Sequence, residues 1–387
     1  MTEFQNEPDF MLSEMLEQPR ILDSIISDTH IKEIGEYLLE SDVERIYITG
    51  SGDSYCAAWF GAYLGEKWHP TLDIRHYAPF EFVNYLNPKH LKKSVIIGIS
   101  VSGNTPRVVE AIRFAQKRNV TTIGITDNPQ GKLSRESDHA LFIHASPSES
   151  LETTAYTSKG ARDYIGYHHD VAQTKTYLGN LAVLSLLMAH SSQESPDHLR
   201  SIQQTFQLVS SAIQQRQKYL DLSKEIGKNT DKIFFIASGP NRPTGLFGSY
   251  KMFEFTLNGF ACDIEEYCHT GYFITTEKTS VIFLVPDNYS MNRIMEIEPV
   301  VKEDIKANCT ILVNSILKDE TESNSIPLSL PDENVLSPMI FTIPVEFISY
   351  SIAKTGGFDT NRFRGGRETE KYVSGSYKTI RKSKLWY

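Results

Sequence analysis

The sequence predicts an α/β protein that consists of two doubly wound parallel-sheet domains in tandem, each a three-layer sandwich. Short runs rich in Val and Ile alternate with helical patterns, and the runs at residues 45–49 and 95–99 end in turns of small residues that open a helix. The order of strand, turn, helix and strand then recurs in the second half. With 387 residues, the chain suits two domains of roughly 150 to 200 residues, each able to bury its own core.

The first half contains the clearest elements. Residues 10–40 look helical, with a break at Pro19. Strands are expected at residues 45–49, 95–99, 121–126 and 141–144. The glycine turn after the first strand leads into an apolar helix at residues 56–64, and Pro106 opens a helix after the second strand. The apolar side of this later helix is formed by Val108, Val109, Ile112 and Ala115.

The middle and second half are less regular. Residues 146–170 are polar and without periodicity, which indicates a lid or a mobile insertion, and an apolar helix then ends near Met188. A helix from Ser195 carries one apolar stripe and connects the halves. Its stripe consists of Leu199, Ile202, Phe206, Val209 and Ile213. Three strands at residues 233–237, 281–285 and 310–313, a polar loop at 318–334 and a buried element at 340–352 follow.

These elements define five segments of the chain. They are an N-terminal helical segment (1–40), a first domain (41–192), a linking helix (193–230), a second domain (231–366) and a basic tail (367–387). We expect the tail to be solvated.

Composition excludes several classes of protein. The net charge is −9, and because residues 362–387 hold eight Lys and Arg against two Glu, the rest carries −15, so we expect no nucleic-acid partner. Neither a secretory signal nor an apolar run long enough for a bilayer is present, which indicates no membrane partner. The four cysteines lack paired spacing, which predicts no metal site and no disulfides and fits a reducing cytoplasm. They are Cys56, Cys262, Cys268 and Cys309.

The loop at residues 100–105 is a candidate anion site. It offers hydroxyls and free backbone N–H groups at the positive end of a helix, as a phosphate monoester requires. In the alternative, Ser and Thr only cap the helix. A dinucleotide site is a further alternative near Gly50 and Gly52, since Asp73 lies about where a ribose-binding acid would sit, but the bulky Tyr55 occupies the place of the third glycine.

Several motifs carry a resemblance to a known family. They are GSGDS (50–54), SVSGNT (100–105), VAQTK (171–175), ASGPNRPTG (237–245), FEFT (253–256), EEYCH (265–269), PVEFISY (344–350) and DTNRFRGG (359–366). With them the chain resembles the tandem SIS-domain phosphosugar isomerases, whose domains are flavodoxin-like. It looks like the isomerase half of the glucosamine-6-phosphate synthases and, in the second half, like the fructoselysine-6-phosphate deglycases.

The resemblance implies a phosphosugar substrate bound by the first domain, without a cofactor. The phosphate-binding residues that it implies are Ser54, Ser100, Ser102 and Thr105. It also places Gly52, Asp53, Val101, Val171 and Gln173 at the substrate. Gln173 departs from the Ser that the family usually presents there.

Proton transfer between C1 and C2 of an open-chain sugar needs a base at the carbon and an acid–base group at the oxygens. The resemblance assigns the base to Glu254, whose apolar neighbours Phe253 and Phe255 could raise its pKa. The alternative is an exposed helical glutamate. The resemblance assigns the acid–base group at the oxygens to His269. In relatives this histidine can reach a neighbouring subunit's site, so we expect a homodimer or a higher homo-oligomer with shared active sites.

The family pattern is not complete around this histidine. The usual Gly-Pro after it is Thr270-Gly271 here, and the spacing from Glu254 is one residue shorter than expected. A loop histidine bonded to backbone is therefore the alternative.

The imine-forming lysine of the synthases has no match, because the aligned place reads Arg364-Gly365-Gly366-Arg367. Lys251 is another candidate, with an ordinary surface lysine as the alternative. The missing lysine favours a 6-phosphorylated ketosamine, from which an amine is released, as substrate. Alternatives are an aldose–ketose isomerase, a deaminase of an amino-sugar 6-phosphate, or a non-catalytic phosphosugar-binding regulator. Because no nucleophilic Cys follows Met1, we do not expect synthase activity on glutamine.

Overall fold

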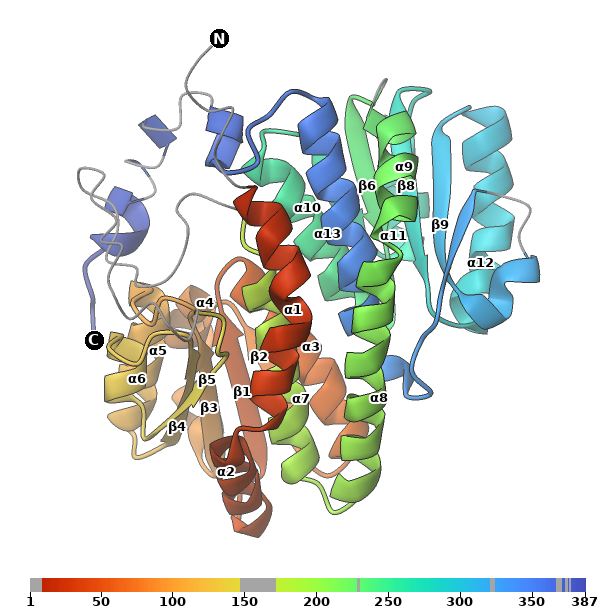
Figure 1. Cartoon of the computed structure of the whole chain (residues 1–387). Helices are drawn as coiled ribbons and strands as arrows, with labels where there is room; N and C mark the ends of the chain where they lie inside the picture. The colour runs from red at the N-terminus through yellow and green to blue at the C-terminus, as the bar shows by residue number, and fades with distance from the viewer. Residues whose placement is uncertain are drawn as a thin grey trace.

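The structure is a computed structural model that describes residues 9–146, 172–227, 230–320 and 324–366, with residues 371–372, 375 and 377–387 of the C-terminal segment. It contains two five-stranded sheets that follow one another along the chain (Figure 1). The first consists of β1 (Arg45–Gly50), β2 (Asp73–Tyr77), β3 (Ser94–Ile99), β4 (Thr121–Thr126) and β5 (His139–Phe142). The second consists of β6 (Lys232–Ile236), β7 (Gly259–Cys262), β8 (Thr279–Val285), β9 (Asn308–Asn314) and β10 (Ser325–Leu328).

Both sheets have the same topology. The first has the order β2-β1-β3-β4-β5, and the second, read from its other edge, has the order β7-β6-β8-β9-β10. All the strand pairs are parallel. The prediction of two doubly wound α/β units in tandem is therefore confirmed.

The central strands lie where the Val- and Ile-rich runs predicted them, whereas the edge strands were predicted poorly. The edge strand β5 begins two residues before its predicted range, and the edge strands β2, β7 and β10 were not predicted. Strand β10 lies inside the stretch 318–334, so the expectation of a loop there is wrong at residues 325–328. Edge strands are partly exposed and need few apolar residues, which removes the sequence signal.

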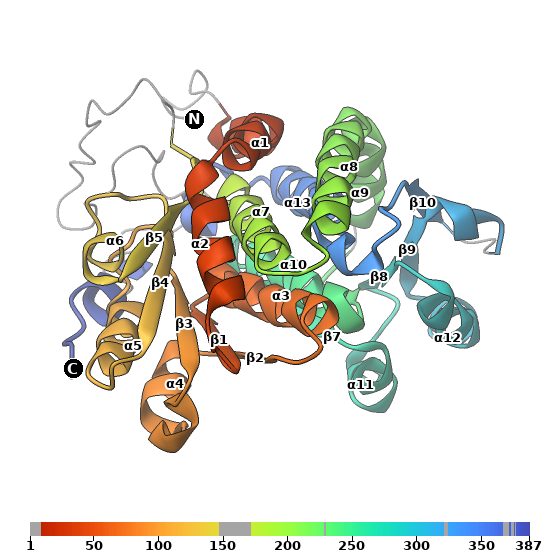
Figure 2. The same ribbon diagram turned by 90° about the horizontal axis from the view of Figure 1, so that it is seen from below.

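Helices cover both faces of each sheet (Figure 2). The outer face of the first sheet is covered by α4 (Pro79–Tyr85), α5 (Pro106–Gln116) and α6 (Lys132–Glu136). The outer face of the second is covered by α11 (Ile264–His269) and α12 (Asn288–Pro299). Between the sheets lie α1 (Phe10–Ile26), α2 (Thr29–Glu40), α3 (Asp53–Trp68), α7 (Lys175–His190), α8 (Ser195–Gln214), α9 (Arg216–Gly227), α10 (Arg242–Glu254) and α13 (Pro338–Thr355).

The two units share one core between their sheets. The largest buried cluster includes Ile46 and Ile97 of the first sheet together with Phe235 and Ile282 of the second. The expectation that each domain buries its own core is thus wrong for the inner faces. The cause lies in α7 and α13, which are buried on all sides over residues 175–189 and 338–353.

The segment Asn334–Thr355, which includes α13, is long and apolar enough to cross a membrane by length and composition alone. In the structure, 94% of an apolar 18-residue window within this segment is buried inside the protein. Its composition is therefore that of a central core helix.

The N-terminal helix does not break at Pro19. Helix α1 continues through it, because Met15, Ile21 and Leu22 on either side are buried in the shared core, and this burial offsets the hydrogen bond that proline cannot donate. The break comes later, where the side chain of Asp28 accepts a hydrogen bond from the backbone N–H of His30 and so caps α2.

The last residues of the chain pack against the first unit rather than extending into solvent. The Trp386 N–H donates to Glu110 Oε1 at 2.6 Å, and the guanidinium of Arg107 lies 4.4 Å from the centre of the Trp386 ring. The rings of Tyr387 and Phe114 are 5.4 Å apart. These residues contact α5 although their side chains stay exposed, 60% for Trp386 and 36% for Tyr387.

Candidate functional site

The strand order of the first sheet reverses between β1 and β3, and at the carboxyl end of strands at such a position open α/β sheets have their ligand-binding crevice. Helix α3 after β1 packs on the inner face of the sheet, and α5 after β3 packs on the outer face. The two loops therefore diverge, and this is where open α/β sheets bind ligands. The loops are residues 50–53 and residues 100–105, the two stretches that the sequence singled out.

Hydrogen bonds fix the loop after β3. Ser100 Oγ donates to Thr105 Oγ1 at 2.8 Å and lies 3.5 Å from Ser102 Oγ. Thr105 is the N-cap residue of α5, but its side chain makes no capping hydrogen bond to that helix. The observed geometry thus differs from that of an ordinary capped turn, because the hydroxyls turn toward one another inside the loop.

A glycine allows this loop to lie close to its neighbour. Gly103 has a φ of 64°, and a Cβ there would lie 3.0 Å from Gly131 Cα and 3.0 Å from Thr126 Oγ1. The Leu133 N–H donates to the carbonyl of Gly103 at 2.8 Å. The loop is therefore held in place before any ligand binds.

The other side of the crevice is the start of α3. Gly52 has a φ of 60° and precedes Asp53, the first residue of the helix. Ser54 follows in the same turn and is buried. Three of the predicted residues therefore lie in succession at this helix start.

Lys251 connects this helix start to the second unit. Its Nζ lies 2.9 Å from Asp53 Oδ2, 2.9 Å from the carbonyl oxygen of Gln173 and 2.8 Å from Glu254 Oε2. The lysine side chain is 0% exposed. The ammonium donates hydrogen bonds to Asp53 and Gln173, whereas its contact with Glu254 is an ion pair in which Glu254 Oε2 accepts no hydrogen bond from the described residues. Because Asp53 belongs to α3 and both Lys251 and Glu254 to α10, the ammonium bridges the two units.

These contacts exclude two interpretations of Lys251. Burial alone would lower the pKa of Lys251, but the carboxylates of Asp53 and Glu254 outweigh burial and raise it above its ordinary value. The side chain therefore stays an ammonium at neutral pH and is not the free amine that an imine requires. The alternative of an ordinary surface lysine is wrong because the side chain is buried.

Glu254 ends α10 with its carboxylate at the junction of the units. Its Oε2 is buried, while 25% of the side chain is exposed, so it is not a simple surface glutamate. Burial raises the pKa of Glu254 to about 7, Lys251 opposes this rise, and Asp53 adds to it. Of the two flanking aromatic residues, Phe255 is buried and Phe253 is 54% exposed. A carboxylate with this pKa can accept a proton near neutral pH.

A further layer of buried polar groups supports this junction from α1 and α13. Glu14 Oε2 accepts the N–H of Thr174 at 3.2 Å, next to the carbonyl of Gln173 that binds Lys251. Gln18 donates to Glu346 Oε2 at 2.6 Å. Burial raises the pKa of both Glu14 and Glu346. Sequence reasoning missed this layer, although carboxylates within apolar helical runs are a signal of buried function.

His269 does not join this group within one chain. It is the exposed last residue of α11, which packs on the outer face of the second sheet through Ile264 and Tyr267. Among the described residues, no hydrogen bond or ion pair connects His269 to Glu254 or to the loop after β3.

The remaining predicted residues have different positions. The carbonyl of Val101 accepts the Asp127 N–H at 3.0 Å, and the side chain of Gln173 accepts a hydrogen bond from Thr176 at 3.3 Å. Val171 and nearly all of the polar segment 146–170 lie outside the described residues.

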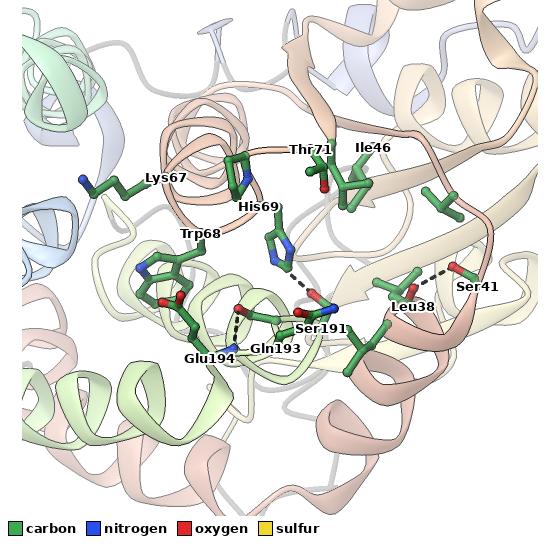
Figure 3. Close-up of a pocket in the computed structure, with 15 residues that line it drawn as sticks. Leu38, Ser41, Ile46, Lys67, Trp68, His69, Thr71, Ser191, Gln193 and Glu194 are labelled. Carbon is green, nitrogen blue, oxygen red and sulfur yellow. Dashed lines mark hydrogen bonds between the residues drawn. The ribbon is translucent and has the colours of Figure 1, made fainter.

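A hollow of about 480 Å³ lies at the opposite end of the first sheet (Figure 3). It is lined by the ends of α3 and α7, including Trp68, His69 and Ser191, and by Ile46 at the start of β1. Among its lining residues, His69 is fixed by a hydrogen bond between its Nε2 and the carbonyl oxygen of Met188, at 3.0 Å. None of the predicted site residues that the structure describes lines it.

The family model of the SIS domain matches residues 40–161. This range contains the whole first sheet and its crevice, and the second sheet repeats the same strand order. The chain thus contains an SIS domain at residues 40–161.

Known proteins resemble this SIS-domain chain along most of its length. A glutamine–fructose-6-phosphate aminotransferase (isomerizing) from Pyrococcus horikoshii is 26% identical over 372 residues, which cover 92% of this chain and 56% of that protein. The chain thus spans a little more than half the length of this curated relative. The C-terminal domain of the glucosamine-fructose-6-phosphate aminotransferase from Francisella tularensis has a TM-score of 0.74 and 20% identity, over 92% of this chain and 98% of that domain.

Two solved structures of other named activities share the fold. A glucosamine-6-phosphate deaminase from Thermotoga maritima has a TM-score of 0.62 and 18% identity, over 91% of this chain and 97% of that one. A tagatose-6-phosphate ketose/aldose isomerase from Escherichia coli has a TM-score of 0.69 and 16% identity, over 93% and 97%. At these identities the likeness concerns the fold.

Proposed function

We propose that this SIS-domain protein is an enzyme that transfers a proton between C1 and C2 of a 6-phosphorylated ketosamine and releases an amine. The observation that carries this proposal is the start of α3. There Ser54 lies beside the crevice with the hydroxyl loop, and its neighbour Asp53 is ion-paired to Lys251, which in turn contacts Glu254 at 2.8 Å. These contacts support a phosphate site and a base on either side of the start of α3.

The chemistry follows from the states of these groups. The hydroxyls of Ser54, Ser100, Ser102 and Thr105 and the N-terminus of α5 hold the phosphate. The Glu254 carboxylate takes a proton from C1, and a proton returned to C2 turns the ketosamine into an imine of the aldose. Water then hydrolyses this imine, so that one ketosamine 6-phosphate and one water yield one aldose 6-phosphate and one amine. Lys251 holds Glu254 and forms no bond to the sugar.

His269 serves as the acid–base group at the sugar oxygens, supplied by a second copy of the chain. Its exposed position on α11 supports this role, since a side chain that faces outward from one protomer can enter the site of another. The active form is then a homodimer or a higher homo-oligomer.

Two other activities use the same groups. The solved deaminase and the solved ketose/aldose isomerase with this fold support a second candidate, in which the chain isomerises a hexose 6-phosphate or deaminates an amino-sugar 6-phosphate. A phosphosugar-binding regulator without catalysis is the third. A non-catalytic regulator would leave one feature of Glu254 unexplained, because burial raises the pKa of this carboxyl group to about 7.

Glu254→Gln separates the enzyme from the regulator. Turnover should fall by about 10² to 10⁴, with binding of the sugar phosphate retained, because only the base is removed. Glu277→Gln, an exposed glutamate of the same unit, is the matched control and should change nothing. Unaltered turnover in Glu254→Gln would remove this residue from the mechanism.

Three substrates separate the enzymatic candidates. The wild-type protein is incubated with a fructosamine 6-phosphate, an aminohexose 6-phosphate and a hexose 6-phosphate, and released amine and aldose are assayed. We expect amine and aldose 6-phosphate in equal amounts from the first. Turnover of the second or third alone would replace the proposal with deamination or isomerisation.

A further inference from the structure

We propose that Asp53 selects substrates that carry a protonated amine, so that this one carboxylate determines the class of sugar phosphate that the site accepts. The inference rests on the proposed function and assigns its amine specificity to one residue. Asp53 is suited to this role by its charge balance, its accessibility and its place between the two ends of the site.

The charge balance is negative at the junction of the units. One ammonium, that of Lys251, contacts two carboxylates, those of Asp53 and Glu254, at 2.9 and 2.8 Å. When both are ionised, the group carries one surplus negative charge. A cationic ligand offsets this charge, whereas a neutral hydroxyl does not.

Both carboxylates are accessible enough to meet such a ligand, since the side chains of Asp53 and Glu254 are 20% and 25% exposed, while that of Lys251 is 0% exposed. Because Glu254 is the proposed base, Asp53 is the carboxylate left to bind the amine. Asp53 Oδ2 accepts from Lys251, and among the described residues the other oxygen, Oδ1, has no hydrogen-bond donor. A carboxylate can accept several hydrogen bonds, so Oδ1 is available to an ammonium that arrives from the crevice.

The place of Asp53 also fits a ligand of two charges. It directly follows Gly52 and precedes Ser54 at the start of α3, the helix that follows β1, next to β3 in the sheet. A carboxylate near a phosphate is repelled unless a cation lies between or beside them. Lys251 supplies this cation, and the amine, at the end of the sugar remote from its phosphate, can meet the oxygen of Asp53 that Lys251 does not contact.

The competing explanation is that Asp53 only neutralises Lys251. It predicts that loss of the carboxylate weakens all ligands alike, because the lysine and Glu254 would shift together. The two explanations therefore differ in how a change at Asp53 affects ligands with and without an amine.

Two unreactive probes test this difference. Hexitol 6-phosphate and 1-amino-1-deoxyhexitol 6-phosphate both lack a carbonyl, so neither can be isomerised or hydrolysed, and they differ by one amine. Their dissociation constants are measured by calorimetry at pH 7.5 with the full chain. We expect the wild type to bind the amine probe about tenfold more tightly or better, and Asp53→Asn to lose most of this preference while binding hexitol 6-phosphate almost as before.

Two further variants keep the test interpretable. Asp53→Glu retains the charge and should retain a preference for the amine, and Asp197→Asn, at an exposed position of α8, should behave as the wild type. Equal binding of both probes by the wild type, or an equal loss for both probes in Asp53→Asn, would overturn the inference. Because the probes do not react, failure of the proposed turnover on ketosamines would be seen separately and would leave this binding result readable.

Discussion

Among the single residues, Lys251 makes the contacts that hold the candidate site together. The structure places its ammonium between acceptors from both halves of the chain, with no exposure to solvent. A buried charge of this kind is costly without its partners, and its partners are equally costly without it. The lysine is therefore a structural centre of the site, although the sequence offered it only as a nucleophile or a surface residue.

Replacement of this lysine should destabilise the protein strongly. Lys251→Met leaves Asp53 and Glu254 without their cation, and we expect a loss of about 3 to 5 kcal/mol in the free energy of unfolding, measured with urea. Lys224→Met, which removes an exposed partner of Asp221, should leave the free energy almost unchanged. A small effect at Lys251 would mean that its ion pairs are not formed in solution.

The pKa of Glu254 predicts how activity depends on pH. A base must be deprotonated, so kcat/KM should rise with pH through about 7 and level off above it. Stability should change in the opposite direction. The folded state holds the proton more tightly than the unfolded chain, so the contribution of Glu254 is complete at pH 4 and is lost between pH 4.5 and about 7.

Glu254→Gln should remove the second effect. A comparison of its urea unfolding with that of the wild type at pH 5 and pH 8 isolates the contribution of this carboxyl group. An identical pH dependence in both proteins would contradict the raised pKa.

Sequence alone indicated the loop residues of the site better than its buried charges. Ser100, Ser102 and Thr105 were named because hydroxyls between a strand and a helix have a local signature, and their role as phosphate ligands stays a prediction. The roles of Glu14 and Glu346 depend on which helices meet in three dimensions, and no local pattern contains that information. Glu254 and His269 were named through a resemblance, and their roles stay predictions.

Among the individual elements, the loop at residues 100–105 gives the clearest test. Ser102→Ala combined with Thr105→Ala removes two of its converging hydroxyls, and we expect KM for the phosphorylated sugar to rise about tenfold or more while kcat changes less. Ser211→Ala on the exposed face of α8 is the control. An unaltered KM would place the phosphate elsewhere.

Strands and helices differ in how readily the sequence revealed them. Central strands such as β3 and β8 are buried on both faces and read as continuous apolar runs. Edge strands carry no such run, and β2 has Ile74 as its one buried residue. Helix α1 was misread for another reason, since tertiary burial on both sides of Pro19 outweighed a local rule.

The whole molecule differs from the expected pair of separate domains because its inner core is shared. The strand order repeats, as predicted, but the helices between the sheets bury residues from both halves in one cluster. The segment boundaries that we drew at residues 192 and 231 stay a prediction. These boundaries separate the two sets of strands along the chain, but they do not separate the hydrophobic core, which both halves share.

An oligomer with shared sites makes a prediction that no single chain can fulfil. If His269 acts in the site of another protomer, inactive Glu254→Gln and inactive His269→Asn proteins should regain activity when mixed under conditions that allow exchange of subunits. Each variant alone, carried through the same exchange, is the control. Failure to regain activity, with exchange verified by mass spectrometry, would place both groups in one chain or remove His269 from catalysis.

The all-round burial of α7 also has a consequence for synthesis on the ribosome. This helix packs mainly against α1, α2, α3 and α8, but Tyr177 stacks on Phe247 of α10 with ring centres 4.0 Å apart and α13 also contacts the helix, so part of its apolar surface has no cover until α10 and α13 have been translated. Nascent chains in that interval should engage chaperones, and truncated products that end before α10 should aggregate or be degraded. The order of synthesis thus exposes, for a time, apolar surface that the folded protein buries.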